Sequence, residues 1–159
     1  MAVLAFQTAT DAELDTIQTF VDSLYEIQTS SGNGRADIRL TFKEFSAHPE
    51  KGQIVSFKFD DHLCGYAIVV FFWSNEYRGN VLEIDELFVK PEYRRKKIAK
   101  SFFDWLEEEH HSAGWALQVS PDNLTACKFY SKLGFKETPS NYLFKDSIDD
   151  DFQRTLTKE

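Results

Sequence analysis

The sequence contains few of the residues that mark loop-rich, repetitive or cross-linked proteins. Its 159 residues include only seven glycines, four prolines and two cysteines, Cys64 and Cys127. So little glycine and proline argues against a low-complexity chain. Two isolated cysteines do not make a disulfide framework. We therefore expect one ordinary folded domain with reduced thiols.

Long apolar segments are also missing. The longest apolar run, Tyr66–Trp73, is much shorter than the roughly 20 residues that a helix needs to cross a bilayer. The N-terminus lacks the basic-then-apolar pattern of a signal peptide. These two absences predict a cytoplasmic protein without a membrane partner.

The charge is acidic overall but basic in one short segment. A net charge of −8 disfavours nucleic acid as a partner and favours cationic ligands. Between Lys90 and Lys100, however, six basic residues accompany one acidic residue, Glu92. Such a cluster in an acidic chain indicates a local anion site, and a solvated helix start is the alternative.

Apolar periodicity predicts an α/β, or α+β, domain over residues 1–146, followed by an acidic tail at 147–159. The mixed β-sheet should carry helices on both faces. Helices are expected at 11–28, 39–46, 96–112 and 120–133. Strands are expected at 54–59, 65–72, 81–89 and 115–119, with a last pair formed from 135 onward and by 142–145.

The segment 87–100 has the layout of a phosphate site. An apolar strand ends at Val89, the chain turns at Pro91, and a helix begins a few residues later. Backbone N–H groups at a helix start have no partner within the helix, and the helix dipole adds partial positive charge there. Nearby Arg and Lys side chains strengthen anion binding. A nucleotide-like diphosphate fits this arrangement.

This segment resembles the acyl-CoA motif of GNAT superfamily N-acetyltransferases. In that motif Arg or Gln is followed by Gly three residues later and by Gly or Ala five residues later. Arg94 and Ala99 match the first and last positions, Lys97 replaces the first glycine, and Arg95 stands where a further glycine is common. Glycine lets the backbone approach a ligand closely. Lysine can serve at position 97 if its φ stays negative and its side chain points away or along the phosphates.

A second segment resembles the later motif of the same superfamily, Asn…Ala…Phe-Tyr…Gly-Phe. It runs from Asn123 to Phe135, so the resemblance covers about 64–145. Asn123 and Tyr130 are two helical turns apart and face the same side. The resemblance implies that Asn123 contacts the pantetheine and that Tyr130 is the general acid that protonates the departing thiolate.

The resemblance also implies an enzyme with acetyl-CoA as acyl donor and no metal, and it allows a homodimer. The backbone of Leu87 and Val89 would bind the pantetheine arm as an added strand would. The implied cofactor-binding residues are Leu87, Phe88, Val89, Arg94, Arg95, Lys96, Lys97, Ile98, Ala99, Lys100, Asn123 and Tyr130.

An acceptor amine needs a proton acceptor. An amine of pKa ~10.4 costs roughly 4–5 kcal/mol to deprotonate at neutral pH. The strand at 81–89 contains three carboxylates, and we predict Asp85 as the base and Glu86 as the residue that orients or binds the amine. Structural ion pairs are the alternative for each.

Strand periodicity predicts which face each carboxylate occupies. Side chains alternate between the two faces of a strand. Glu83 and Asp85 should therefore share a face with Leu87, whereas Glu86 should share the other face with Ile84.

The aromatic strand, the loop with Tyr77 and Gly79, and the acidic pair before Phe88-Val89 resemble the spermidine/spermine (diamine) N-acetyltransferase subgroup, with the order of Asp and Glu reversed. This implies a polyamine or diamine acceptor that attacks acetyl-CoA directly in a ternary complex. A protein, peptide or amino-acid amine, or an aminoglycoside, remains open. From a different class, a non-catalytic acyl-CoA-binding or protein-interaction module also remains open, because glycines of the loop are replaced.

Overall fold

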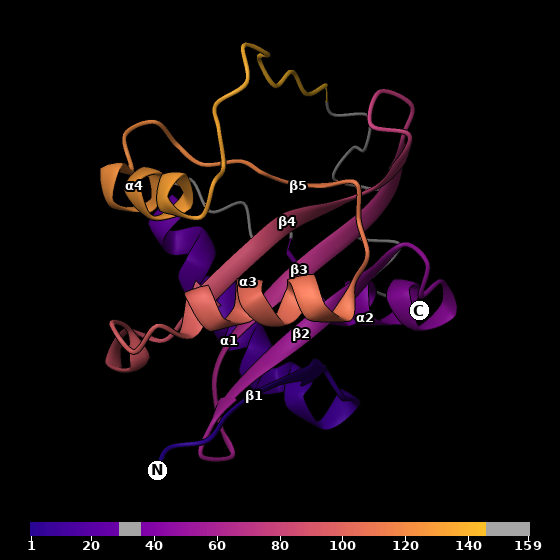
Figure 1. Cartoon of the computed structure of the whole chain (residues 1–159). Helices are drawn as coiled ribbons and strands as arrows, with labels where there is room; N and C mark the ends of the chain where they lie inside the picture. Colours follow the sequence, from indigo (N-terminus) through magenta and orange to yellow (C-terminus); the bar gives the residue numbers. More distant parts are fainter. Residues whose placement is uncertain (29–35, 146–159) are drawn as a thin grey trace.

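The computed structural model describes residues 1–28 and 36–145, so the acidic tail predicted at 147–159 lies outside the described residues. The described chain forms one sheet in the order β1-β2-β3-β4-β5 (Figure 1). Its strands are β1 (Leu4–Thr8), β2 (Gly52–Phe59), β3 (His62–Ser74), β4 (Gly79–Val89) and β5 (Gly114–Leu117). Neighbours pair antiparallel except β4 and β5, which are parallel. The predicted mixed sheet is confirmed.

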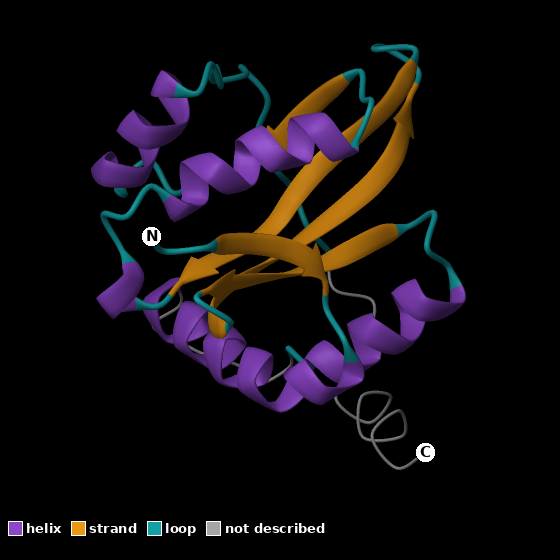
Figure 2. Ribbon diagram, turned by 60° about the horizontal axis from the view of Figure 1, so that its bottom comes forward, coloured by secondary structure: helices purple, strands orange, loops and turns teal. Residues whose placement is uncertain are grey.

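Helices cover both faces of this sheet, as predicted (Figure 2). Their bounds are α1 (Leu14–Gln28), α2 (Ile38–Ala47), α3 (Ile98–Glu109) and α4 (Leu124–Lys132). One core joins the apolar stripes of α1 and α2 to the sheet, and a second core joins α3 and α4 to the opposite face. Among the helices that the structure describes, none combines the length and apolar character needed to cross a bilayer.

The long apolar run in β3 is explained by these two cores. Tyr66 and Ile68 pack toward α1, whereas Ala67 and Val69 pack toward α3. A strand covered on both faces needs apolar residues at every position, so it shows no polar alternation. β3 is consequently the central strand on which both layers depend.

Two predictions about the strands are wrong. β1 was not expected, because it is a short edge strand with a half-exposed, weakly alternating sequence. The last pair of strands does not form, since residues 135–145 contain no strand and Tyr142, Leu143 and Phe144 are exposed. Strand-forming side chains are not enough when no pairing partner is present.

β4 contains one residue without a partner in β3. Glu86 pairs with Ile68 and Ile84 pairs with Val69, so that Asp85 is left over. One extra residue in one strand is a β-bulge, which bends the strand and increases its twist. The sheet therefore changes direction at Asp85.

The bulge also corrects the predicted faces of the carboxylates. Ile84 packs in the α3 core, whereas Glu86 contacts Tyr66 on the α1 face, so the two do not share a face. Glu83 pairs with Val70, which packs on the α1 core, so Glu83 does not share the α3 face of Leu87. The prediction from simple alternation failed because the extra residue shifts the alternation of side chains by one residue and so moves them to the other face.

The close packing of β3 between its neighbours can be tested at Gly65. A Cβ on Gly65 would overlap the carbonyl oxygen of Phe88 and would lie 2.9 Å from the ring of Phe57. We expect Gly65→Ala to lower the free energy of unfolding by about 2 kcal/mol or more.

Gly114→Ala is the matched control, because a Cβ added to Gly114 in β5 would meet no atom within 4 Å. Its free energy of unfolding should stay within about 0.5 kcal/mol of the wild type in urea denaturation. Equal stabilities for the two variants would contradict this packing.

Candidate active site

β4 and β5 run together for only a short distance and then separate (Figure 1). β5 pairs with Val81–Ile84 and ends at Leu117, so no described strand pairs with that edge of β4 beyond the bulge. The Lys90 N–H donates to the Cys64 carbonyl over 2.8 Å. Antiparallel strands bond through alternate residues, so the backbone groups of Leu87 and Val89 point away from β3.

These outward groups make a ready strand edge. The Val89 carbonyl accepts a hydrogen bond of 2.9 Å from Nε of Arg94, which agrees with its outward direction. An extended ligand with amide groups can bind such an edge as an added strand would. The opening beyond the bulge therefore offers backbone donors and acceptors to a linear, polar chain.

The loop before α3 adopts the conformation of a glycine-rich loop without glycine. Arg95 and Lys97 have φ of +62° and +59°. The condition stated for lysine at position 97, a negative φ, is therefore not met. These are the two positions at which the acyl-CoA motif prefers glycine, and a left-handed conformation costs other residues about 1–2 kcal/mol each. The backbone shape of the motif is kept although its side chains differ.

The same loop leaves a row of backbone N–H groups without a protein acceptor. The first paired amide of α3 is that of Ser101, which donates to the Lys97 carbonyl over 3.0 Å. Among the described residues, the N–H groups of 95–100 donate to no acceptor. Free amides at a helix start form an anion-binding site.

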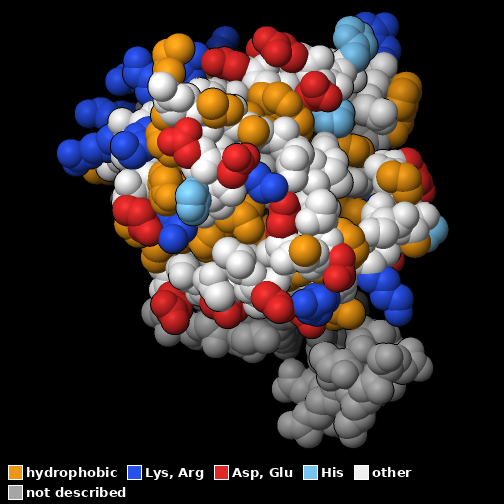
Figure 3. Space-filling view, turned by 90° about the horizontal axis from the view of Figure 1, so that it is seen from below, with side chains coloured by type: hydrophobic (Ala, Val, Ile, Leu, Met, Phe, Trp, Pro, Cys, Tyr) orange, Lys and Arg blue, Asp and Glu red, His pale blue; other side chains and the backbone are white. Residues whose placement is uncertain are grey.

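Most of the basic side chains between Lys90 and Lys100 contact other groups of the protein. They contact a carboxylate, a carbonyl or an aromatic ring: Lys90 with Glu92, Lys100 with Asp104, Arg94 with Val89 and Phe88, and Lys96 with Phe59. Arg95 and Lys97 have no such contact with a described residue. On the face of the molecule that Figure 3 draws, many of the Lys and Arg side chains gather at the upper left edge. Two cations are thus left for a ligand beside the free amides.

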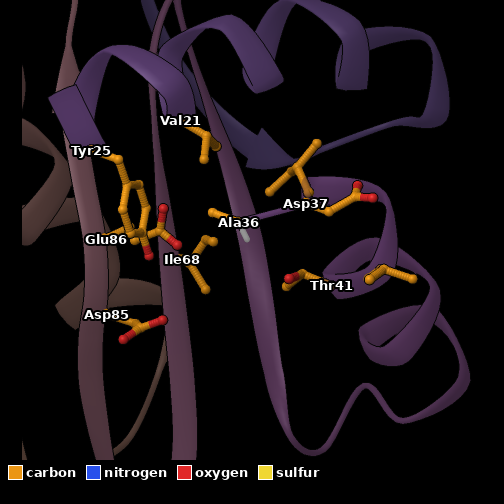
Figure 4. A pocket seen from close by; sticks show the side chains of 10 residues that line it. Val21, Tyr25, Ala36, Asp37, Thr41, Ile68, Asp85 and Glu86 are labelled. Atoms are coloured by element: carbon orange, nitrogen blue, oxygen red, sulfur yellow. The ribbon is translucent and has the colours of Figure 1, made fainter. Parts of the chain in front are cut away.

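On the α1 face, an acidic cavity of about 300 Å³ opens beside the bulge (Figure 4). Its lining residues come from α1, α2, β3 and β4 and from the segment before α2: Val21, Tyr25, Ala36, Asp37, Ile38, Leu40, Thr41, Ile68, Asp85 and Glu86. We call it the acidic pocket. These described lining residues include three carboxylates and no Lys or Arg, so the pocket suits a cationic ligand.

Glu86 is half-buried in the wall of this pocket. The Tyr66 hydroxyl donates to Oε1 of Glu86 over 2.8 Å. Burial raises the pKa of Glu86 to about 7, and the neighbouring Asp85 adds to this against the opposing effect of the Tyr66 hydrogen bond. Burial also raises the pKa of Asp85. Glu86 can therefore both hold and release a proton near neutral pH.

Three further groups, two in the pocket and one beneath it, were not predicted. Burial, with the charges of Glu86 and Asp85, raises the pKa of Tyr25 to about 12, so its hydroxyl remains protonated. The Asp37 carboxylate begins α2 by accepting the Arg39 N–H over 2.9 Å. Tyr66 is fully buried beneath Glu86. In the sequence, the helical spacing of Tyr25 from Val21 and the polar hydroxyl of Tyr66 within an apolar run are the signals that could have indicated these two tyrosines.

Gln18 fixes the segment that carries Asp37. Its side chain donates to the Ala36 carbonyl over 3.1 Å and accepts the Ile38 N–H over 2.9 Å. The amide of Gln18 thus acts on both sides of Asp37 as a backbone partner would. This holds one acidic wall of the pocket against α1.

Tyr130 and Asn123 lie together on α4, on the other side of the sheet. Tyr130 packs against Phe103 and Phe135 in the α3 core, and burial raises its pKa. Oδ1 of Asn123 accepts the Ala126 N–H over 3.2 Å and begins the helix. No contact joins Tyr130 to Asp85 or Glu86, so the structure brings the two carboxylates together and leaves Tyr130 apart from them.

Residues 19–135 match the model of the acetyltransferase (GNAT) family. The chain belongs to this family. It is accordingly an acetyltransferase, with acetyl-CoA as the acyl donor that the family uses. Among the described residues, no group of three or more His, Cys, Asp or Glu side chains is arranged to hold a metal ion.

Solved structures share the fold. One is a possible acetyltransferase from Clostridium difficile 630, with 23% identity, a TM-score of 0.72, and coverage of 92% of this chain and 99% of that one. Another is a ribosomal-protein-alanine N-acetyltransferase from Brucella melitensis biovar Abortus 2308, with 16% identity, a TM-score of 0.69, and coverage of 92% and 100%. A third is an aminoglycoside N-acetyltransferase in complex with CoA, with 16% identity, a TM-score of 0.68, and coverage of 93% and 97%. No curated protein matches the sequence.

The left-handed loop makes a prediction about stability. Valine is strongly disfavoured at positive φ and glycine is not. Lys97→Val should therefore be less stable than Lys97→Gly by about 1–2 kcal/mol in urea denaturation. The neighbouring Lys96 does not have a positive φ, so Lys96→Val should be at least as stable as Lys96→Gly. If Lys97→Val were at least as stable as Lys97→Gly, as is expected at position 96, residue 97 would not be left-handed.

Burial of Glu86 makes a prediction about pH. Its pKa rises from 4.5 to about 7 on folding, so the folded state binds more protons and stability falls as the pH rises through this window. At pH 8 we expect Glu86→Gln to be more stable than the wild type by up to about 3 kcal/mol, from ~1.4 per pKa unit.

This gain should shrink as the pH falls from 7 toward 4.5 and vanish below 4.5, where the carboxyl becomes protonated in both states. Glu83→Gln removes the same charge from β4 outside the pocket and is the control. Thermal or urea unfolding measured across this pH range gives both curves. A constant difference between Glu86→Gln and the wild type would contradict the shifted titration.

Proposed function

We propose that this acetyltransferase moves the acetyl group of acetyl-CoA to a small primary amine bound in the acidic pocket, by direct attack within a ternary complex. One observation carries the proposal: Asp85 and Glu86 line a cation-attracting pocket at the bulge where the sheet opens. An amine bound there would lie beside the opening proposed for the cofactor. Proximity of the two reactants supplies much of the acceleration in such reactions.

The cofactor site lies along β4 and the start of α3. The free amides of 95–100, including those of Lys96, Ile98, Ala99 and Lys100, would hold the diphosphate, with Arg95 and Lys97 adding charge. Arg94 keeps the loop against β4 through Val89. The backbone of residues 87–89 would bind the pantetheine arm, and Asn123 would contact it from α4.

The proton steps divide between the two sides of the sheet. Glu86 takes a proton from the ammonium, because a base works best when its pKa lies near the working pH. Asp85 holds the cationic amine. This reverses the two roles that the sequence favoured. The amine nitrogen then attacks the thioester carbonyl and the C–S bond breaks. The Tyr130 hydroxyl protonates the departing thiolate, and the second proton that the nitrogen loses as the amide forms restores this hydroxyl.

The three carboxylates favour an acceptor with more than one ammonium group, a polyamine or diamine. One ammonium would lie at Asp85 and Glu86, and Asp37 at the start of α2 would attract a second. The aliphatic wall from Val21 and Ile68 suits the methylene chain between them. A lysine side chain offers the same chemistry with a single charge.

The experiment titrates acetyl-CoA into the protein by calorimetry and then measures thiol release with a panel of amines. The panel contains spermidine, a short diamine, free lysine, a lysine peptide and an aminoglycoside. We expect acetyl-CoA to bind and the two polycationic chains to react with the largest kcat/KM. Binding without thiol release would indicate a non-catalytic acyl-CoA module, and no binding would indicate an interaction protein.

Tyr130→Phe is the active-site variant for the same assay. Loss of the hydroxyl should lower kcat at least tenfold and leave the Kd for acetyl-CoA nearly unchanged. Tyr142→Phe is the matched control, since Tyr142 is exposed near the end of the described chain. A wild-type rate for Tyr130→Phe would remove Tyr130 from the mechanism.

A further inference from the structure

Tyr66 is the buried partner of the proposed base. Its side chain has no solvent exposure, and it does not line the acidic pocket, whereas Glu86 does. Its hydroxyl donates to Oε1 of Glu86 over 2.8 Å. Tyr66 can therefore influence a bound amine only through this carboxylate.

The ring of Tyr66 is held firmly enough to orient its partner. It lies 6.5 Å from the ring of Phe20 on α1 and 6.5 Å from the ring of Phe88 on β4, measured between centroids. Tyr66 and Phe88 are also paired across the two strands. A donor fixed in this way holds Oε1 on the core side of Glu86 and leaves Oε2 for the pocket.

The described groups around Glu86 give it no cationic partner. Those facing it are Asp85 on β4, Tyr25 on α1, Asp37 at the start of α2 and Tyr66 on β3. None of the described residues lining the pocket is Lys or Arg. A half-buried carboxylate without a cationic partner depends on hydrogen bonds to remain ionised.

We propose that Tyr66 is a positioning residue that keeps Glu86 ionised, with one oxygen directed at the amine, and that it thereby sets the lower pH limit of acetyl transfer. This inference rests on the proposed function. When the ammonium gives up its proton, Oε2 of Glu86 receives it while Oε1 keeps the Tyr66 hydrogen bond. The tyrosine hydroxyl itself loses no proton, since burial and the charge of Glu86 raise its pKa.

The test is the pH profile of kcat/KM for the best amine of the panel, in the wild type and in Tyr66→Phe. We expect the acidic limb to move upward by about one pH unit, which is about a tenfold loss below the limb. Above the limb the two rates should converge. A merely structural role would lower the rate by the same factor at every pH and would contradict the proposal.

A double-mutant cycle isolates the contact. In Glu86→Gln the limb should disappear, and adding Tyr66→Phe should then produce no further shift. Phe20→Leu is the packing control, because it loosens the ring of Tyr66 without removing the hydroxyl. It should move the limb far less than Tyr66→Phe does, and an equal shift would overturn the role of the hydroxyl.

A measurement on the wild type keeps the proposal testable if Tyr66→Phe does not fold. Carbon-13 NMR can follow the Glu86 carboxyl and Cζ of Tyr66 through a pH titration. Both signals should change with one shared midpoint, and an unchanged Tyr66 signal would contradict the coupling. Absence of turnover with every amine contradicts the proposed function, whereas turnover with an unmoved limb contradicts only the role of Tyr66.

Discussion

One unpaired residue in a strand, Asp85, determines how the rest of the site is arranged. Because Ile84 and Glu86 both keep partners in β3, the extra residue must bend β4 away from β5. The bend ends the pairing with β5 at Ile84 and leaves the outer edge of Leu87 and Val89 without a partner among the described strands. It also puts Asp85 and Glu86 together in the acidic pocket. A regular strand would have closed the opening and separated the two carboxylates.

Positive and negative charges lie at different places on the sheet and its helices. Free amides and the cations of Arg95 and Lys97, which contact no described side chain, collect at the start of α3, whereas the carboxylates gather on the α1 face. Both arrangements are unfavourable without a ligand, through left-handed backbone at one place and through neighbouring carboxylates with raised pKa values at the other. Such strain is expected where ligands of opposite charge, an anionic cofactor and a cationic amine, relieve it on binding.

The sequence predicted the parts of the fold that follow periodicity. The apolar run in β3, the stripe of α3 and the two family motifs were enough for the mixed sheet, its two helical layers and the family. The sequence did not predict the bulge at Asp85, where one extra residue shifts the alternation of side chains between the two faces. It also failed where strand formation depends on a pairing partner, at edge strand β1 and at the unpaired segment 135–145. Tyr25 in the pocket and Tyr66 beneath it were missed because a tyrosine on an apolar face looks like core until its hydroxyl is located.

The most direct test of the opening in the sheet is amide hydrogen exchange of β4 with and without CoA. In the free protein the N–H groups of Phe88 and Lys90 are bonded to β3 and should exchange slowly, whereas those of Leu87 and Val89 should exchange fast. Saturating CoA should protect Leu87 and Val89 and change Phe88 and Lys90 little. Protection of Leu87 and Val89 in the free protein, or no change with bound CoA, would contradict an open strand edge as the cofactor site.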